Sequence, residues 1–173
     1  MKNKFITLIL ALSMSLCLSC SREIPPVFEI YVTFKNAEKY DQININVSYA
    51  EYGSLDQMTK LPSGSGTISF DSRSKSISKM KFDQKTFITS VAQNIGMSDF
   101  LSLNGSLELH SDQKINSVFF DKRRNVFPVN FNPEFGEAYE LNFIIDIENS
   151  IVPNGNGFDF KLGGDSKVVI TKY

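Results

Sequence analysis

The alternation of apolar and polar residues is the feature that most constrains how this chain can fold. Phe28, Ile30, Val32 and Phe34 occupy every second position of one segment. A period of two puts successive side chains on opposite faces of a β-strand, so such a segment buries one face only. The same period recurs in residues 43–49, 115–120, 126–131, 139–147, 158–162 and 168–171. Short strands separated by turns predict an all-β fold, an antiparallel β-sandwich of the immunoglobulin or transthyretin type, with a closed β-barrel as the alternative.

Turn residues between these segments predict which strands pair. We expect the strands at 28–34 and 43–49 to pair antiparallel across residues 36–40. Three hairpins are expected further along the chain: 67–70 with 77–82, 101–103 with 107–109, and 115–120 with 126–131. In the second hairpin, a three-residue loop keeps the leucines of both arms on one face, whereas a two-residue Asn-Gly turn would divide them.

Residues 83–96 are predicted to form one short amphipathic helix. Asp83 is a suitable N-cap, Phe87, Val91 and Ile95 recur on one helical face, and Gly96 can end the helix. A lone amphipathic helix in a β domain would cover an edge or an open end of the sandwich.

The first residues have the pattern of a secretory signal. Lys2 and Lys4 precede an apolar run over residues 5–18. As a helix this run would measure about 21 Å, which is shorter than the ~30 Å hydrocarbon core of a bilayer, so a permanent transmembrane helix is disfavoured. We therefore predict a signal peptide over residues 1–19.

The end of this leader resembles the lipobox of bacterial lipoproteins, in which a small residue precedes the cysteine that receives diacylglycerol. Ser19 is the small residue and Cys20 the acceptor, while Cys17 stands where leucine is usual. We predict lipidation, including palmitate, at Cys20; cleavage without lipid and an uncleaved anchor are the alternatives. Ser21 after the cysteine is similar to an outer-membrane sorting signal.

Composition is compatible with one domain behind this anchor. We expect a tether over residues 20–26 and a single sandwich domain over residues 27–173. Without residues 1–19 the chain has 16 basic and 19 acidic residues, which argues against a nucleic-acid partner. Both cysteines fall within the first 20 residues, so stability must come from packing, for which 15 Phe and 6 Tyr supply apolar area.

Residues 36–45 and 146–157 carry recognisable motifs. The first reads N-A-x-x-Y-D-x-I-N-I and the second D-x-x-x-S-I-V-x-x-G-N-G. They resemble the D-A-P…Y-D-x-V-x-V and D-x-x-x-S-I-V-x-x-G-N-G segments of an uncharacterised bacterial lipoprotein family, domain of unknown function 4382. Glu38 replaces the proline of that family's first segment. The resemblance implies an exported β-rich domain with no established activity.

Few residue constellations point to catalysis or metal binding. His110 is the only histidine, so any Ser–His–Asp relay would have to use it, yet Ser111 and Asp112 beside it are typical of a strand end and turn. One histidine and no free mature cysteine leave too few ligands for zinc. We predict no catalytic residue, no cofactor and no metal site.

Four other segments allow a functional interpretation, but a structural one explains each more simply. Residues 154–159 resemble a calcium turn, although a tight turn with positive φ accounts for the glycines. Residues 163–165 lack the ending of a phosphate loop. The basic run at 122–124 fits a solvated hairpin tip, and the spacing of Glu134 and Glu137 does not fix the distance between their carboxylates.

These observations predict a lipid-anchored protein of the bacterial cell envelope, on the outer membrane. Its sandwich would be a non-enzymatic module for binding, adhesion or assembly, with a surface protein or a glycan as partner. The alternative is a carrier that holds an apolar small molecule inside a β-barrel. A hydrolase with an unrecognised site is the third class of function.

Overall fold

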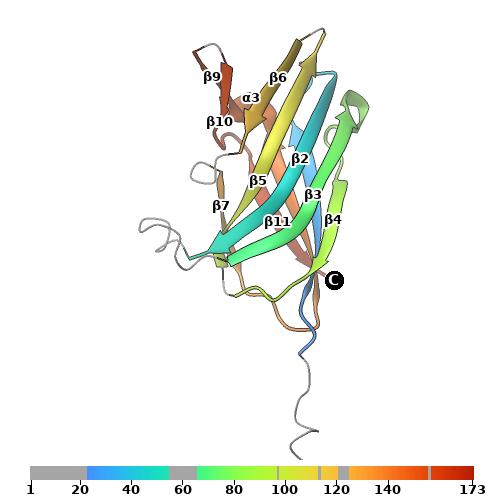
Figure 1. The fold of residues 1–173 in the computed structure, drawn as a ribbon, viewed down its shortest axis with the longest axis vertical. Helices are drawn as coiled ribbons and strands as arrows, with labels where there is room; N and C mark the ends of the chain where they lie inside the picture. Colours follow the sequence, from blue (N-terminus) through green and yellow to red (C-terminus); the bar gives the residue numbers. More distant parts are fainter. Residues whose placement is uncertain (1–22, 55–65, 97, 113, 121–124, 156) are drawn as a thin grey trace, which may run out of the picture.

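The computed structural model describes residues 23–54, 66–96, 98–112, 114–120, 125–155 and 157–173. Within these residues, strands form two facing sheets and a separate two-stranded ribbon (Figure 1). The strands in chain order are β1 (Val27–Lys35), β2 (Gln42–Gly53), β3 (Gly66–Ser78), β4 (Thr86–Ala92), β5 (Ser98–Ser111), β6 (Lys114–Phe119), β7 (Val126–Phe131), β8 (Ala138–Asp146), β9 (Ile151–Asn154), β10 (Gly157–Phe160) and β11 (Lys167–Lys172).

The four-stranded sheet has the order β11-β8-β1-β4. β1 pairs antiparallel with β4 on one side and parallel with β8 on the other. The parallel register runs from Val27 opposite Ala138 to Lys35 opposite Asp146. The first strand is therefore held at the middle of its sheet by a strand that begins more than a hundred residues later.

The larger sheet has the order β3-β2-β5-β6, and β7 also pairs with β5. β6 pairs with residues 106–111 of β5 and β7 with residues 98–102, so both follow the same edge of that strand. The predicted hairpin between residues 115–120 and 126–131 is therefore wrong. β5 is long enough for β6 and β7 to pair with it one after the other. Each of these two short strands therefore shows the same alternation of apolar and polar residues as it would in a hairpin.

The two sheets are open in the described part of the chain. β11 and β4 are the edges of one sheet, while β3 lies at one edge of the other and β6 at its opposite edge. The predicted all-β sandwich is confirmed, and the alternative of a closed barrel is wrong for these strands.

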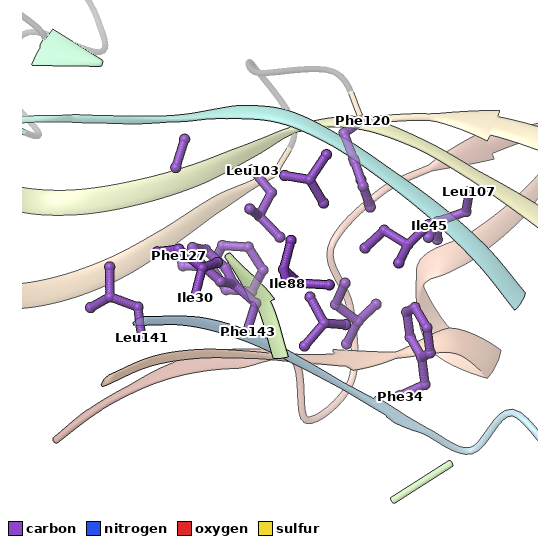
Figure 2. Packing of buried hydrophobic residues seen from close by; sticks show 14 of the residues in the cluster. Ile30, Phe34, Ile45, Ile88, Leu103, Leu107, Phe120, Phe127, Leu141 and Phe143 are labelled. Carbon is purple, nitrogen blue, oxygen red and sulfur yellow. The ribbon is translucent and has the colours of Figure 1, made fainter. Parts of the chain in front are cut away.

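Apolar side chains from both sheets fill the space between them. Figure 2 shows Ile30 and Phe143 from one sheet and Ile45 and Leu103 from the other, all within this shared interior. The rings of Phe127 and Phe143 pack edge to face with centroids 5.3 Å apart. Full burial of a side chain of this size contributes about 2 kcal/mol relative to exposure, so packing of this kind can stabilise a domain without disulfides.

Residues 83–96 contain the strand β4, and the predicted helix is wrong. A register shift in the pairing with β1 leaves Ile88 as a bulge residue, so that Ile88 and Thr89 are buried in succession. The extra residue of this bulge widens the spacing between the apolar side chains from two residues to one that is typical of a helix. Thr, Ile and Val are β-branched and favour a strand. Asp83 has a φ of 68°, the left-handed conformation of a turn residue rather than of an N-cap.

β3 continues through residues 71–75, where a turn was expected, and its pairing with β2 shifts register between Ser69 and Arg73. Residues 73–75 are exposed on an edge strand, which needs only one partner and tolerates polar residues. The predicted hairpin of residues 67–70 with 77–82 is therefore wrong.

β5 likewise runs straight through the predicted loop at Asn104–Ser106. The leucines at 101, 103, 107 and 109 still share the inward face, because every second residue of a single strand does so. Gly105 serves a close approach rather than a turn, since a Cβ there would lie 1.9 Å from the backbone oxygen of Asn46. Opposite it, Ser48 forms a bulge that moves the inward set of β2 from Val47 to Ala50.

β1 and β2 lie in different sheets, so the pairing expected across residues 36–40 is wrong. Asn36 has a φ of 51°, and the Tyr40 amide donates to the Ala37 carbonyl at 3.0 Å, which turns the chain from one sheet to the other. Both strands face one core, and each therefore shows the alternation that a pair within one sheet would show.

Helical structure is brief in the described residues. A single turn of 3-10 helix, η1 (Lys79–Lys81), links β3 to β4, and α3 (Ile147–Ser150) follows β8. None of the described helices is long and apolar enough to cross a bilayer. The predicted signal peptide and the predicted lipid attachment at Cys20 lie outside the described residues.

Candidate functional site

The outward side of the larger sheet carries a shallow hollow of about 410 Å³. Amide, hydroxyl, ammonium and carboxylate groups of β2, β3 and β5 form its walls. We call this surface the polar face, and its residues are Gln42, Asn44, Asn46, Ser74, Lys75, Ser76, Ser106 and Glu108.

Strand register brings these residues together. Asn44 of β2 lies opposite Ser76 of β3 on one side and opposite Glu108 of β5 on the other. Residues directly opposite in antiparallel strands point to the same face of a sheet. Ile43 and Ile45, on either side of Asn44, are fully buried. The alternation that builds the core therefore also aligns a row of polar side chains outside it.

Asn44 is the centre of a hydrogen-bonded group on the polar face. The Gln42 side-chain amide donates to Oδ1 of Asn44 at 2.7 Å, and Nδ2 of Asn44 donates to a carboxylate oxygen of Glu108 at 3.0 Å. The same Nδ2 lies 3.1 Å from Nε2 of His110. When the imidazole proton is on Nδ1, Nε2 accepts a hydrogen bond from the second hydrogen of the Asn44 amide. These bonds hold the side chains in place, so less rotamer freedom is lost when a ligand binds.

Strand formation alone does not explain the composition of the polar face. Asn and Ser are depleted in strands, yet they recur at the outward positions of β2 and β3. Their amides and hydroxyls offer many hydrogen-bond donors and acceptors with little net charge. A neutral ligand with several hydroxyl groups matches such a surface.

Two exposed apolar side chains of β6 border the polar face. Ile115 is 61% exposed and lies opposite His110, while Phe119 is 73% exposed and lies opposite Ser106. An aromatic ring beside a row of polar groups suits a ligand that presents both hydroxyls and apolar C–H surfaces.

The structure separates the members of the His110-Ser111-Asp112 sequence. His110 is on the polar face, whereas consecutive strand residues point to opposite faces, so Ser111 is turned away from the imidazole. Asp112 has a φ of 51° and its amide donates to a carboxylate oxygen of Asp41 at 3.0 Å. The interpretation of this sequence as a strand end and turn is confirmed.

The glycine-rich segment after β9 is the turn of the β9–β10 ribbon. Gly155 has a φ of 56°, in the left-handed region, as the prediction of a tight turn requires. The side-chain amide of Asn154 donates to a carboxylate oxygen of Asp159 at 3.0 Å. Among the described residues, no group of three or more His, Cys, Asp or Glu side chains is placed to hold a metal ion.

The two motif-bearing segments, residues 36–45 and 146–157, meet at one end of the smaller sheet. Asp146, the first residue of the second motif, is 1% exposed and pairs with Lys35 just before the first motif. One of its carboxylate oxygens accepts from the Asn149 amide at 3.2 Å as a helix N-cap of α3, and the other accepts from the Asp165 amide at 3.2 Å. Asn36 also bonds to this carboxylate.

Hydrogen bonds keep the Asp146 carboxylate ionised. Burial alone would raise the pKa of Asp146, but the hydrogen bonds from Asn149, Asn36 and the Asp165 amide outweigh it and hold that pKa below its ordinary value. Ser150 of the same motif accepts from the Gly163 amide at 3.2 Å. The conspicuous residues of the second motif and the glycines at 163–165 thus build one structural junction.

The other sequence candidates also have defined surroundings or fall outside the description. Glu134 and Glu137 both pair with the Lys172 ammonium, at 2.9 and 3.3 Å, so the structure does bring these two carboxylates together. Hydrogen bonding to Glu134 is the main reason that the pKa of Lys172 is raised. The basic run at residues 122–124 lies outside the described residues.

A second side-chain cluster, on the outward side of the smaller sheet, was not predicted from the sequence. Glu29 lies opposite Glu140, and its carboxylate accepts from the hydroxyls of Tyr31 and Tyr173, each at 2.9 Å. The Lys85 ammonium donates to both carboxylate oxygens of Glu140, at 2.9 and 2.7 Å. The hydrogen bond to Glu29 is the largest cause of the raised pKa of Tyr173. We call these residues the tyrosine–glutamate cluster.

Comparisons with known proteins found a similar solved structure but no sequence match. The chain matches no protein-family profile, and no curated protein matches its sequence. A crystal structure of a proposed cell adhesion protein from Bacteroides eggerthii DSM 20697 is similar over 85% of this chain and 54% of its own length. The sequence identity is 12% and the TM-score is 0.38. Because 54% of the other protein is covered, this chain spans about half of its length.

Proposed function

We propose that this chain is a lipid-anchored protein of the bacterial cell envelope, on the outer membrane, whose sandwich is a non-enzymatic binding module. The polar face binds a neutral glycan. The observation that carries this proposal is the preordered row of amide and hydroxyl side chains around Asn44 in an open hollow of about 410 Å³.

The surroundings of the ionisable residues on the polar face support binding rather than catalysis. The Glu108 carboxylate and the His110 imidazole both contact the Asn44 amide, so their hydrogen bonds order the binding surface. A binding role needs only the hydrogen-bonding capacity of these two side chains.

Packing of the phenylalanines favours this proposal over the apolar carrier. Phe28 packs against Phe131 and Tyr139 with ring centroids 6.0 and 5.7 Å away. Phe120 and Phe160 meet edge to face at 4.9 Å. Aromatic side chains that pack on one another stabilise the interior, whereas a carrier would direct them toward a cavity.

The start of the sandwich is compatible with a lipid on Cys20. β1 begins at Val27, so the seven residues from Cys20 onward would reach at most about 25 Å when extended. Pro25 and Pro26 favour extension of this tether.

Glycan binding can be tested by titrating neutral oligosaccharides into the full chain in detergent. We expect Asn44→Ala and Glu108→Gln each to weaken binding about tenfold, because each removes a group that fixes the network. Thr171→Ala, an exposed hydroxyl position on β11 of the opposite sheet, is the matched control and should bind like the wild type. Equal binding by all four proteins, or none by the wild type, would refute the assignment of the polar face.

Palmitate labelling tests the anchor. Wild type should incorporate label and Cys20→Ala should not, while Cys17→Ala should be labelled like the wild type. Equal label in the wild type and in Cys20→Ala contradicts lipidation at this residue.

A further inference from the structure

We propose that the open side of the sandwich between β3 and β4 binds an extended acidic segment of a partner protein, which adds as a strand. The groove there has a volume of about 470 Å³. It is lined by Arg73, Ser74 and Lys75 of β3 and by Phe87, Ile88, Thr89 and Ser90 of β4. The groove shares Ser74 and Lys75 with the rim of the polar face and is otherwise lined by different residues, and the proposal does not depend on the glycan site.

Both walls of the groove are edge strands. β4 pairs with β1 and β3 pairs with β2, and neither has a second strand partner among the described residues. Figure 1 shows the two strands along the same side of the molecule. Gln93 closes one end, where its side chain bonds to the Thr67 carbonyl and accepts from the Ser69 amide at 3.1 Å. Beyond that end, the backbone edges can pair with an added strand.

Two cationic side chains of β3 are directed toward the groove. Arg73 lies opposite Val47, and Lys75 lies opposite Ile45, while Val47 and Ile45 are both fully buried. Residues opposite each other share a face, so Arg73 and Lys75 start from the core side of the sheet and reach its open edge. Lys75 also borders the polar face, which places it at the rim between the two surfaces.

The whole segment around the groove is basic. Residues 73–90 contain five basic residues and one acidic residue, whereas the complete chain has 18 basic and 19 acidic residues. Two of these charges are paired away from the groove, Asp83 with Lys35 and Lys85 with Glu140. The charged residues that line the groove itself, Arg73 and Lys75, are both cationic. Charge complementarity therefore selects an acidic occupant.

Inward-pointing charge on an edge strand also excludes the wrong partner. Two copies of β3 brought edge to edge would set Arg73 and Lys75 near the same cations of the second copy, and proteins use such charges against self-association. An acidic strand relieves this repulsion, so one set of residues rejects a copy of the chain and admits the partner.

The test uses the full chain in detergent and three labelled peptides of roughly eight residues, a typical strand length. One alternates Glu with Val, the second alternates Lys with Val, and the third is the Glu-Val peptide with every backbone amide N-methylated, which keeps the charge but removes the backbone donors. Fluorescence anisotropy should show the Glu-Val peptide binding at least about tenfold tighter than the other two.

Ser90→Glu and Arg73→Glu should each weaken binding of the Glu-Val peptide about tenfold. Val169→Glu, which adds the same charge to β11 opposite Asn142 at the other edge of the smaller sheet, should bind normally. Circular dichroism and glycan titration of the same variants report whether the fold and the polar face are intact.

Each outcome decides the proposal. Equal binding of the N-methylated peptide shows that charge acts without strand pairing, and equal binding of the Lys-Val peptide removes the role of the cations; either result overturns the proposal. No binding of the Glu-Val peptide also overturns it, as does unchanged binding by both groove variants. Loss of glycan binding by the Asn44 variant leaves the groove unaffected, so the two proposals fail separately.

Discussion

The outward faces of the two sheets use polar residues in different ways. On the smaller sheet, Glu140 and Asn142 point outward yet are only 8% and 6% exposed. Lys85 and Tyr173 bond to Glu140, and Thr33 donates to the side-chain oxygen of Asn142 at 3.0 Å. On the larger sheet, the equivalent row of polar groups surrounds an open hollow.

This difference separates polar residues that fasten the fold from polar residues that remain available to a ligand. The tyrosine–glutamate cluster satisfies its groups with one another and links β1, β8 and the segment before β4. The polar face is also preordered, but its side chains keep spare donors and acceptors. Substitutions should therefore change stability on the first face and binding on the second.

The largest loss of stability is expected from Asp146→Ala, at the end of the smaller sheet. It removes a carboxylate that is 1% exposed, leaves the Asn149 and Asp165 amides without their acceptor, and should lower the free energy of unfolding by about 3 kcal/mol. Urea denaturation measures this loss. Glu148→Gln, an exposed acidic position in the same motif, is the control and should change stability by a few tenths of a kcal/mol at most.

The pH dependence of Asp146 follows from its lowered pKa. A group whose pKa is lower in the folded state stabilises the fold above its unfolded pKa, about 4, and this contribution is lost as the pH falls through the folded pKa. Wild type should therefore lose stability on acidification more steeply than Asp146→Ala. Parallel acid profiles would show that the carboxylate is not held ionised by its hydrogen bonds.

Gly105→Ala should give the next largest effect and test whether β5 is continuous. An added Cβ meets the Asn46 backbone oxygen, so β5 and β2 must shift apart at a cost of about 2 kcal/mol. Gly96→Ala has open space around it and serves as the control. If residues 104–106 formed a loop, the two substitutions would have similar small effects on thermal unfolding.

Asn46→Thr, on the polar face, should raise stability while it weakens binding. The side chain is exposed on β2, where a β-branched residue is favoured, so stability should rise by about 0.5 kcal/mol. Oligosaccharide binding should fall in the same protein, because the lost amide lines the hollow. A destabilised variant with normal binding would assign Asn46 to the fold instead.

Tyr173→Phe should have the smallest effect, confined to alkaline pH. Since the Glu29 carboxylate raises the pKa of Tyr173, the neutral hydroxyl stabilises the fold fully below the unfolded pKa of about 10, and that contribution is lost as the pH rises through the folded pKa. The midpoint temperature of thermal unfolding should thus fall more steeply above about pH 10 for the wild type than for the variant. Oligosaccharide binding should be equal in both.

The sequence was sufficient for the fold class because alternation reports which residues face a core. It identified the strand at 139–147, except that Ile147 begins α3, and the two-faced character of the segments at 28–34 and 43–49. It did not identify partners, since β1 shows the same alternation whether it pairs with β2 or with β8, which lies far along the chain. Bulges at Ser48 and Ile88 break the period, and the second of these produced the false helix.

The candidate site could be predicted only in part. Alternation places Asn44 and Asn46 outside, but their meeting with Ser76 and Glu108 depends on the register of three strands. The Asp146 junction left one local signal, an aspartate three residues before Asn149, which is N-cap spacing. Its contacts with Asn36 and Asp165 depend on the fold and leave no local pattern.

The parallel pairing of β1 with β8 has a mechanical consequence. Tension applied to the segment before Val27 acts lengthwise along β1, which has β8 on one side and β4 on the other. Its backbone bonds to both neighbours are then loaded together in shear and do not open one at a time. A tether that leaves the domain at this strand would transmit a pull to the whole sheet.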